Sequence, residues 1–237
     1  MDLNWEYPGY SFGSGYGDVK KIEKDYHGLV ELMKGLRKKL GKDKIITMAY
    51  YPDGRQEQLL LEKQAPLYID LFHMMTYDQS KGHHSPFELA TKSVEQALKI
   101  GLPADKLTLG LPFYGRHSRT GDWTTYEDLV QKYKLTDDMD SVQDSTGIIY
   151  FNGIKSIKKK TRFAIEQGIG GVMIWEVGQD CRLQAVERSG RSHQVTCPNG
   201  SGSSLLVALK EAIGNNYSIG TKSKINQNSL SQKSSEL

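Results

Sequence analysis

Apolar residues recur along the chain with two different spacings, which predict strands and helices in turn. Four short runs are apolar almost throughout, as is typical of strands buried on both faces of a parallel sheet. These runs cover residues 44–51, 68–77, 107–114 and 171–175. Helical spacing predicts helices between and after them, at residues 18–40, 56–66, 85–100, 156–167 and 204–213. This alternation indicates a parallel β/α architecture.

A further strand is predicted at the start of the chain, where polar and apolar residues alternate. Asp2, Asn4 and Glu6 stand two residues apart, so an extended strand directs all three side chains to one face. Leu3 and Trp5 then point to the other face, into packing. Acid-type groups gathered at the end of a strand are an arrangement that catalysis uses. A solvated polar face has the same pattern, and the spacing alone leaves both readings open.

Local signals mark where helices begin and end. Asp18 is expected to cap the first helix, and Gly41 to end it. Ser85 and Glu88 form a capping-box pattern, with a proline at the first helical position between them.

The rest of the chain is less regular. We expect a short helix at residues 125–133, a short strand at 147–151 and an irregular excursion at 180–203. Asn, Ser, Lys and Gln then dominate to the end of the chain, with almost nothing to bury. The sequence therefore predicts one folded domain over residues 1–214 and a disordered tail over residues 215–237.

Polar side chains stand at the carboxyl ends of the predicted strands. The element pattern fits either a doubly wound sheet or a (β/α)8 barrel. The placement of these side chains favours the barrel, since the active sites of such barrels are built at that face. The chain holds five β/α units, however, whereas a barrel needs eight. The side chains in question are those of Glu6, Tyr50, Tyr77, Asp78, Arg116, Trp175 and Glu176.

Length and charge exclude some classes of function. At 237 residues the chain can bury one sizeable core. A net charge of +3 without clustering gives no reason to expect nucleic acid, and the lysines at 158–160 are interpreted as a solvated helix face. No apolar stretch approaches the roughly 18 residues that span a bilayer. We therefore expect a monomer that binds neither nucleic acid nor membranes.

Two cysteines bear on where the protein works. Cys181 and Cys197 flank a polar loop and can form one disulfide. Asn199 and Asn216 lie in acceptor patterns for N-glycosylation. Both features favour a full-length protein that is secreted, although no signal peptide is visible in this chain.

The opening stretch resembles the signature of family 18 glycoside hydrolases, the chitinases and chitinase-like lectins. That signature runs D-G-x-D-x-D-x-E and is usually followed by Y-P. Asp2, Asn4 and Glu6 take its second, third and last acidic positions, and Tyr7 follows them. The first aspartate of the signature would lie before Met1, and the third is an asparagine here.

Three later motifs fit the same family in the right order. Residues 75–78 resemble its M-x-Y-D, residues 111–116 its P-x-Y-G-R, and residues 170–175 its final strand, which ends in a tryptophan. The resemblance implies a TIM barrel of the chitinase type in which strands four to eight are present. Strands one to three would lie upstream, so the chain would be N-terminally truncated. The small α+β insertion that some members carry after strand seven is expected to be absent, giving a shallower cleft.

The resemblance also implies a chemistry. Family 18 enzymes use substrate-assisted catalysis, in which the N-acetyl oxygen of the sugar attacks its own anomeric carbon. Glu6 would be the general acid, and Tyr77 would orient the acetamide oxygen. Asn4 stands where an aspartate offsets the growing positive charge. Because an amide carries no charge, we expect a loss of roughly one to three powers of ten in rate. Asp2 would lie deeper and tune Asn4.

The other site residues would bind sugar. Trp175 would stack on the apolar face of the −1 sugar, Met75 would pack beside the acetyl methyl group, and Asp78 would hold a hydroxyl. Arg116 at the cleft rim and Tyr7 after the acidic motif complete this set, with a surface ion pair as the alternative for Arg116. No cofactor and no metal are implied, and the histidines at 83–84 are interpreted as a loop pair without partners.

Three hypotheses follow. The first is a chitinase-type hydrolase of β-1,4-linked N-acetylglucosamine polymers, indicated by the intact Glu6. The second is a chitin-binding lectin with little or no turnover, indicated by Asn4. The third is a truncated chain without function, because missing strands leave open sheet edges.

Overall fold

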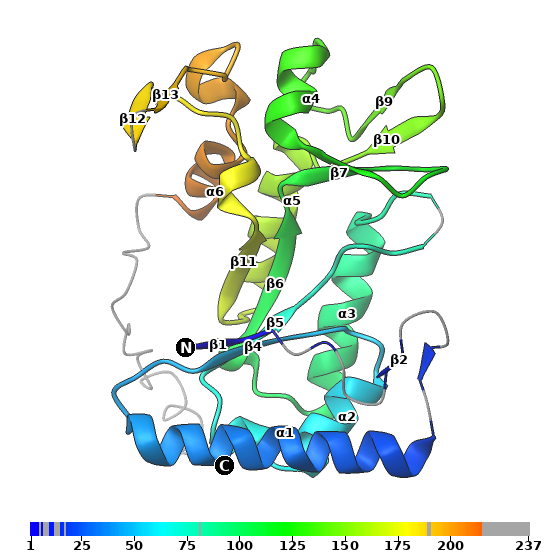
Figure 1. Cartoon of the computed structure of the whole chain (residues 1–237), viewed down its shortest axis with the longest axis vertical. Coiled ribbons are helices and arrows are strands. Elements are labelled where there is room, and N and C mark those ends of the chain that lie inside the picture. Colours follow the sequence, from blue (N-terminus) through cyan, green and yellow to red (C-terminus); the bar gives the residue numbers. More distant parts are fainter. Residues whose placement is uncertain are drawn as a thin grey trace, which may run out of the picture.

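The computed structural model describes residues 1–4, 6, 10–11, 15–16, 18–80, 82–188 and 191–214. Within these residues, the main sheet has five parallel strands in the order β1-β4-β5-β6-β11 (Figure 1). Because all neighbouring strands run parallel, their carboxyl ends meet at one edge. The strands are β1 (Asp2–Leu3), β4 (Thr47–Tyr50), β5 (Leu71–Met74), β6 (Leu107–Pro112) and β11 (Gly171–Trp175).

Helices follow the strands at the predicted places. They are α1 (Val19–Leu40), α2 (Arg55–Glu62), α3 (Phe87–Ile100), α5 (Ile154–Glu166) and α6 (Leu205–Ile213), with a 3₁₀ turn η1 (Ala65–Leu67) after α2 and another, η2 (Ala104–Lys106), after α3.

The first helix shows why these elements form. Asp18 caps α1 by accepting a hydrogen bond from the Lys20 amide at 3.0 Å, and Gly41 ends the helix with a φ of 76°. Its apolar stripe is buried, and α1 crosses the end of the molecule beside β1 and β4 (Figure 1). The stripe consists of Ile22, Tyr26, Leu29, Val30 and Met33.

The core is densest around β6. All six residues of this strand are buried, and α5 packs against both β6 and β11. Phe72 on β5 and Ile157 on α5 are fully buried in the same cluster. The strands whose carboxyl ends meet at one edge are therefore supported by closely packed helices.

The expectation that no α+β insertion follows the seventh strand was wrong. A four-stranded antiparallel sheet, in the order β8-β7-β10-β9, lies between β6 and α5 and carries the helix α4. Its helix α4 and its strand β10 correspond to the predicted helix at residues 125–133 and the predicted strand at residues 147–151, whereas β8 and β9 are too short to give a periodic signal in the sequence. The elements are β7 (Tyr114–His117), β8 (Trp123–Thr125), α4 (Tyr126–Lys132), β9 (Ser141–Gln143) and β10 (Ile148–Tyr150).

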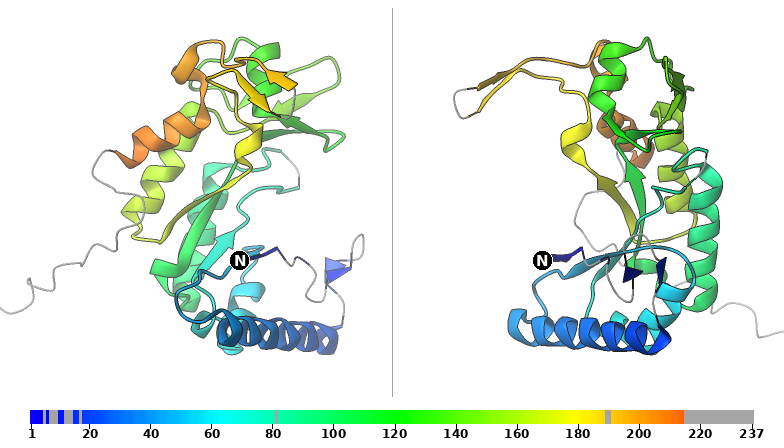
Figure 2. Two further views of the ribbon diagram at one scale, coloured as in Figure 1. Left: turned by 60° about the vertical axis from the view of Figure 1, so that its left-hand side comes forward. Right: turned by 45° about the vertical axis from the view of Figure 1, so that its right-hand side comes forward.

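The segment after β11 is irregular, as predicted. The predicted disulfide between Cys181 and Cys197 is confirmed and closes this excursion. Asp180 links it to α6, because its carboxylate accepts hydrogen bonds from the amides of Leu205 and Leu206 at 3.1 and 2.9 Å. The excursion contains the turns η3 (Val177–Gln179) and η4 (Gly200–Ser203) and the hairpin β12 (Val186–Arg188) with β13 (Arg191–His193), which projects from the body (Figure 2). A second hairpin pairs β2 (Tyr10–Ser11) with β3 (Gly15–Tyr16).

The predicted capping box at the start of α3 was wrong. Pro86 occupies the N-cap, and no side chain caps the helix. The Ser85 hydroxyl instead donates to the carbonyl of Thr76 at 2.7 Å. A tertiary contact has replaced the local one.

The interpretation of Lys160 as part of a solvated helix face was also wrong. Its side chain is 1% exposed, and its ammonium nitrogen donates to Ser85 O, Ser85 Oγ and Asn152 Oδ1, each at 2.7 Å. Lys158 and Lys159 keep more exposed positions on the same helix. Three consecutive lysines point in different directions around a helix, so composition alone cannot assign them one environment.

Residues 215–237, for which a disordered tail is predicted, lie outside the described part of the chain. Among the helices that the structure describes, none combines the length and apolar character needed to cross a membrane.

Candidate active site

The carboxyl edge of the main sheet carries a cavity of about 300 Å³, called the strand-end cavity below. Seven side chains predicted for the site line it: Asp2, Asn4, Glu6, Met75, Tyr77, Asp78 and Trp175. Arg116 is connected to it through Asp78, and Tyr7 falls outside the described residues. The rest of the lining comes from Ala49, Tyr51, His73, Trp123, Met173 and Ile174.

The acidic motif lies on the exposed outer strand of the sheet. Asp2 accepts a hydrogen bond from Thr47 Oγ1 at 2.6 Å, and its carboxylate is 3.9 Å from Nε2 of His73. The Asp2 side chain is 56% exposed, so the expectation that it lies deeper was wrong. The reason is that, among the described strands, β1 pairs with β4 alone. Asn4 and Glu6 are exposed as well and face the cavity.

Tyr77 is held firmly at the end of β5. Its ring is 5% exposed and meets the ring of Tyr114 edge-on at 6.1 Å. This position depends on Gly110 of β6, where an added Cβ would lie 2.9 Å from Tyr77 Cε1 and 2.3 Å from Met74 O. Burial, and then the charges of Asp78 and Glu6, raise the pKa of Tyr77 well above its usual value. Its hydroxyl therefore remains a proton donor at any physiological pH.

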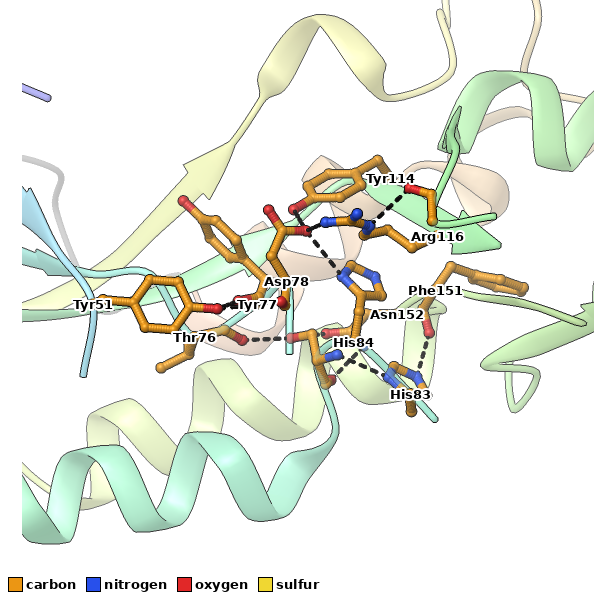
Figure 3. A network of polar contacts seen from close by, with 12 residues as sticks. Tyr51, Thr76, Tyr77, Asp78, His83, His84, Tyr114, Arg116, Phe151 and Asn152 are labelled. Carbon is orange, nitrogen blue, oxygen red and sulfur yellow. Dashed lines mark hydrogen bonds and ion pairs between the residues drawn. The ribbon is translucent and has the colours of Figure 1, made fainter. Parts of the chain in front are cut away.

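Asp78 is the most heavily contacted polar group of the cavity. It adopts a left-handed backbone conformation, with a φ of 62°. Its Oδ1 accepts a hydrogen bond from the Tyr114 hydroxyl at 2.7 Å and an ion pair from Arg116 at 2.9 Å (Figure 3). Burial by itself raises the pKa of Asp78, but His84, Arg116 and Tyr114 outweigh it and hold the pKa below its usual value. Asp78 is therefore an anion at neutral pH.

Apolar side chains form the other wall. Trp175 at the end of β11 is 36% exposed, so its ring offers surface to the cavity. Met75 is 7% exposed and clusters with Tyr77 and Tyr114, and Met173 packs against this cluster. This wall thus combines the accessible ring of Trp175 with the buried side chain of Met75.

The family model of glycosyl hydrolases family 18 matches residues 1–180. The chain belongs to this family.

Chitinases are among the proteins that this chain resembles. Chitinase C of Streptomyces lividans is 28% identical over 223 residues, covering 76% of this chain and 35% of the relative. The solved family 18 chitinase ChiB of Flavobacterium johnsoniae is 27% identical, with a TM-score of 0.60, and covers 89% of this chain and 58% of that one. A chitinase of Cycas revoluta solved with (GlcNAc)3 shares the fold at 18% identity, with a TM-score of 0.54 over 75% of this chain and 63% of that one.

The structural neighbours are family 18 chitinases of the TIM-barrel type, and this chain is mixed α/β with a parallel sheet. It spans about a third to a half of the length of the curated relatives that it matches.

Sequence reasoning missed several residues in and around the strand-end cavity. Trp123 on β8 lines the cavity, is 52% exposed and stacks on Tyr114 at 4.9 Å. The Arg116 guanidinium lies 5.9 Å from the centre of the Trp123 ring. Tyr51 donates to the carbonyls of Tyr77 and Asp78, at 3.2 Å in both cases. Tyr51 is the last residue of a predicted strand and directly follows the observed β4, so the rule that placed the other residues at strand ends could have found it.

The interpretation of the two loop histidines as a pair without partners was wrong for His83. His83 Nε2 donates to the carbonyl of Phe151 at 2.8 Å, and its Nδ1 accepts from the Ser85 amide at 3.0 Å. Burial, followed by its neighbour His84, lowers the pKa of His83 to about 4. His84 is buried beside Asp78 (Figure 3). The contact between His83 and Phe151 joins segments 68 positions apart, so no local sequence pattern predicts it.

Within the residues that the structure describes, no three His, Cys, Asp or Glu side chains are placed to hold a metal ion. A larger cavity of about 570 Å³ lies between α4 and the η4 turn, lined in part by Tyr133 and Asn199. It contains none of the predicted site residues.

Proposed function

We propose that the protein represented by this chain hydrolyses β-1,4-linked N-acetylglucosamine polymers, with retention of configuration and Glu6 as the general acid. The observation that carries this proposal is the strand-end cavity, which gathers Glu6, Asn4, Tyr77 and Trp175 from three separate strands. An acid, a hydroxyl that orients the acetamide and an aromatic platform are the groups that the family resemblance implies for substrate-assisted hydrolysis.

In the proposed reaction, the acetamide oxygen of the bound sugar forms a bond to its own anomeric carbon. The bond from that carbon to the leaving oxygen breaks, and Glu6 gives its proton to this oxygen. Tyr77 donates a hydrogen bond that orients the acetamide, and Asp78 accepts one from a sugar hydroxyl. Water then opens the cyclic intermediate while Glu6 takes a proton back, which restores the enzyme.

Asn4 sets the expected rate. Its amide oxygen can accept a hydrogen bond from the acetamide N–H, but it adds no negative charge beside the cationic intermediate. Electrostatic stabilisation of this kind contributes about 3–4 kcal/mol in well-studied sites. We therefore propose slow turnover, and a binding protein of the chitinase-like lectin type is the second candidate on the strength of the same residue.

The decisive experiment compares the chain with Asn4→Asp and Glu6→Gln variants on chitotetraose, following products by chromatography and binding by calorimetry. We expect slow cleavage by the original chain, faster cleavage by Asn4→Asp and none by Glu6→Gln. Binding without cleavage in all three would support the lectin instead, and absence of binding in all three would reject both candidates.

We further propose that the five strands are the last five of an eight-stranded barrel and that the protein is secreted. The first proposal is supported by the fraction of each structural neighbour that the chain covers, 58% for the Flavobacterium enzyme. The second is supported by the disulfide between Cys181 and Cys197, since such bonds persist in oxidising compartments.

A further inference from the structure

His84 is a buried histidine whose ring nitrogens have no hydrogen-bond partner within the described residues. The side chain is 2% exposed, and Nδ1 lies 3.7 Å from Asp78 Oδ1, just beyond hydrogen-bond distance (Figure 3). Burying two unpaired polar atoms is costly, so their presence next to a cavity carboxylate needs a physical explanation.

The contacts of Asp78 are arranged unequally on its two oxygens. Tyr114, Arg116 and His84 all approach Oδ1, at 2.7, 2.9 and 3.7 Å. Oδ2 receives none of these contacts from the described residues, and Asp78 lines the strand-end cavity. One oxygen is thus held by the protein, and the other is available to accept a hydrogen bond from a ligand.

The position of the His84 ring is itself fixed from two sides. It stacks on His83 at 5.8 Å with an angle of 5° between the planes, and it lies 5.0 Å from the ring of Tyr114. His83 cannot rotate freely, because Phe151 O and the Ser85 amide bind its two nitrogens. Nδ1 of His84 is therefore directed at Asp78 by a supported ring.

The charges around His84 decide its protonation. Asp78 approaches from the end of β5, Arg116 and Tyr114 from β7, Lys160 from α5 and His83 from its own loop. Burial, together with the Lys160 and Arg116 charges, outweighs Asp78 and lowers the pKa of His84. His84 is therefore neutral at pH 7, with one N–H that Nδ1 can direct to Asp78, and it becomes a cation only in acid.

We propose that His84 is a positioning residue for Asp78, holding Oδ1 so that Oδ2 faces the sugar, and that protonation of His84 weakens oligosaccharide binding. This rests on the proposed function, in which Asp78 binds a sugar hydroxyl. A neutral His84 directs its N–H toward Oδ1 from 3.7 Å, close enough for a small shift of Asp78 to form the hydrogen bond. A cationic His84 competes for the carboxylate by an ion pair, which draws Asp78 away from the ligand.

Three substitutions separate these roles. In His84→Asn the amide nitrogen occupies nearly the place of Nδ1 and keeps a donor toward Asp78 without a titrating group. In His84→Gln the amide nitrogen occupies the place of Nε2 instead, and His84→Leu has no donor. His27→Leu, at an exposed histidine on α1, is the matched control.

The affinity for chitotetraose would be measured by calorimetry from pH 4.5 to 8, with thermal melting of each variant alongside. At pH 7 we expect wild-type affinity in His84→Asn and His27→Leu, and an affinity about three- to tenfold lower in His84→Gln and His84→Leu. In acid, the affinity of the wild type falls more steeply than that of His84→Asn. Equal affinity of His84→Leu and the wild type at every pH would overturn the proposal while leaving the proposed function intact.

A measurement without sugar guards against variants that fail to fold. Nitrogen-15 NMR of labelled histidines follows the His84 titration in the wild type and in Asp78→Asn, and we expect the titration to move to lower pH in the variant. An unmoved titration would overturn the coupling. If the wild type binds no chitotetraose at any pH, the sugar-binding part falls together with the proposed function.

Discussion

The buried lysine on α5 gives the sharpest prediction about stability. Burial lowers the pKa of Lys160 to about 7, from an ordinary value of 10.5. Its ammonium group binds only neutral oxygens, those of Ser85 and Asn152, so no direct ion pair offsets the cost of burying a charge.

The sign of the pH dependence follows from proton binding. Below pH 7 both folded and unfolded chains hold the proton, and the full cost of the buried charge is present. Between about pH 7 and 10.5 the unfolded chain holds more protons, so the free energy of unfolding rises with pH over this window. Each pH unit corresponds to 1.36 kcal/mol, so the free energy of unfolding changes over the whole window by about 5 kcal/mol.

The test replaces Lys160 with methionine, and the exposed Lys159 with methionine as the control. Urea unfolding followed by circular dichroism at intervals from pH 6.5 to 9.5 gives the free energy of unfolding for each protein. We expect the difference between wild type and Lys160→Met to change by about 2–4 kcal/mol across this range in favour of the wild type. The Lys159→Met difference should stay constant. Parallel curves for Lys160→Met and the wild type would refute the reasoning.

Three further substitutions have definite outcomes. Gly110→Ala forces a methyl group against Met74 O and Tyr77, so we expect about 1–3 kcal/mol less stability by urea unfolding and weaker chitotetraose binding by calorimetry, and unchanged stability would contradict the close approach. Trp123→Ala removes an exposed ring of the cavity, so we expect weaker binding of chitotetraose with an unchanged melting temperature; unchanged affinity would mean that the ring only packs on Tyr114. Cys197→Ser removes a disulfide that links residues 16 apart, so we expect urea unfolding under oxidising conditions to show a variant about 3 kcal/mol less stable than the wild type. Under reducing conditions the wild type loses the same bond, so the two proteins should then be equally stable.

Much of the fold was predictable because its signals are local. The strands around Phe72 and Leu109 are short, continuous apolar runs, and the helix that begins after Asp18 has a cap and a regular stripe. The site was predictable for a related reason. Parallel strands bring their carboxyl ends together, so residues that follow strands, such as Tyr77 and Trp175, meet in one cavity.

What could not be predicted depends on contacts between distant segments. Lys160 and Ser85 are 75 positions apart in the sequence. Only the folded chain shows that the Ser85 hydroxyl accepts a hydrogen bond from Lys160 and does not cap α3. The exposure of Asp2 depends on which strands flank β1, and its own sequence says nothing about them. In the antiparallel sheet that carries Trp123, β10 was predicted, but β7, β8 and β9 have only three or four residues each, too few for a period to be recognised in the sequence.

Because β1 is the outer strand of the main sheet, the proposed catalytic residue can lose its position without the core unfolding. The two-residue strand contributes Leu3 to the core and is anchored mainly through β4, where the Thr47 amide donates to Met1 O at 2.9 Å. Because β1 makes so few contacts, it can detach locally at a free-energy cost that is a small fraction of the global free energy of unfolding. Hydrogen exchange should then be fast at Leu3 and slow at Leu109, and Glu6 could lose its geometry while the core stays folded. The residue proposed to catalyse the reaction follows a two-residue strand that, among the described strands, pairs with β4 alone.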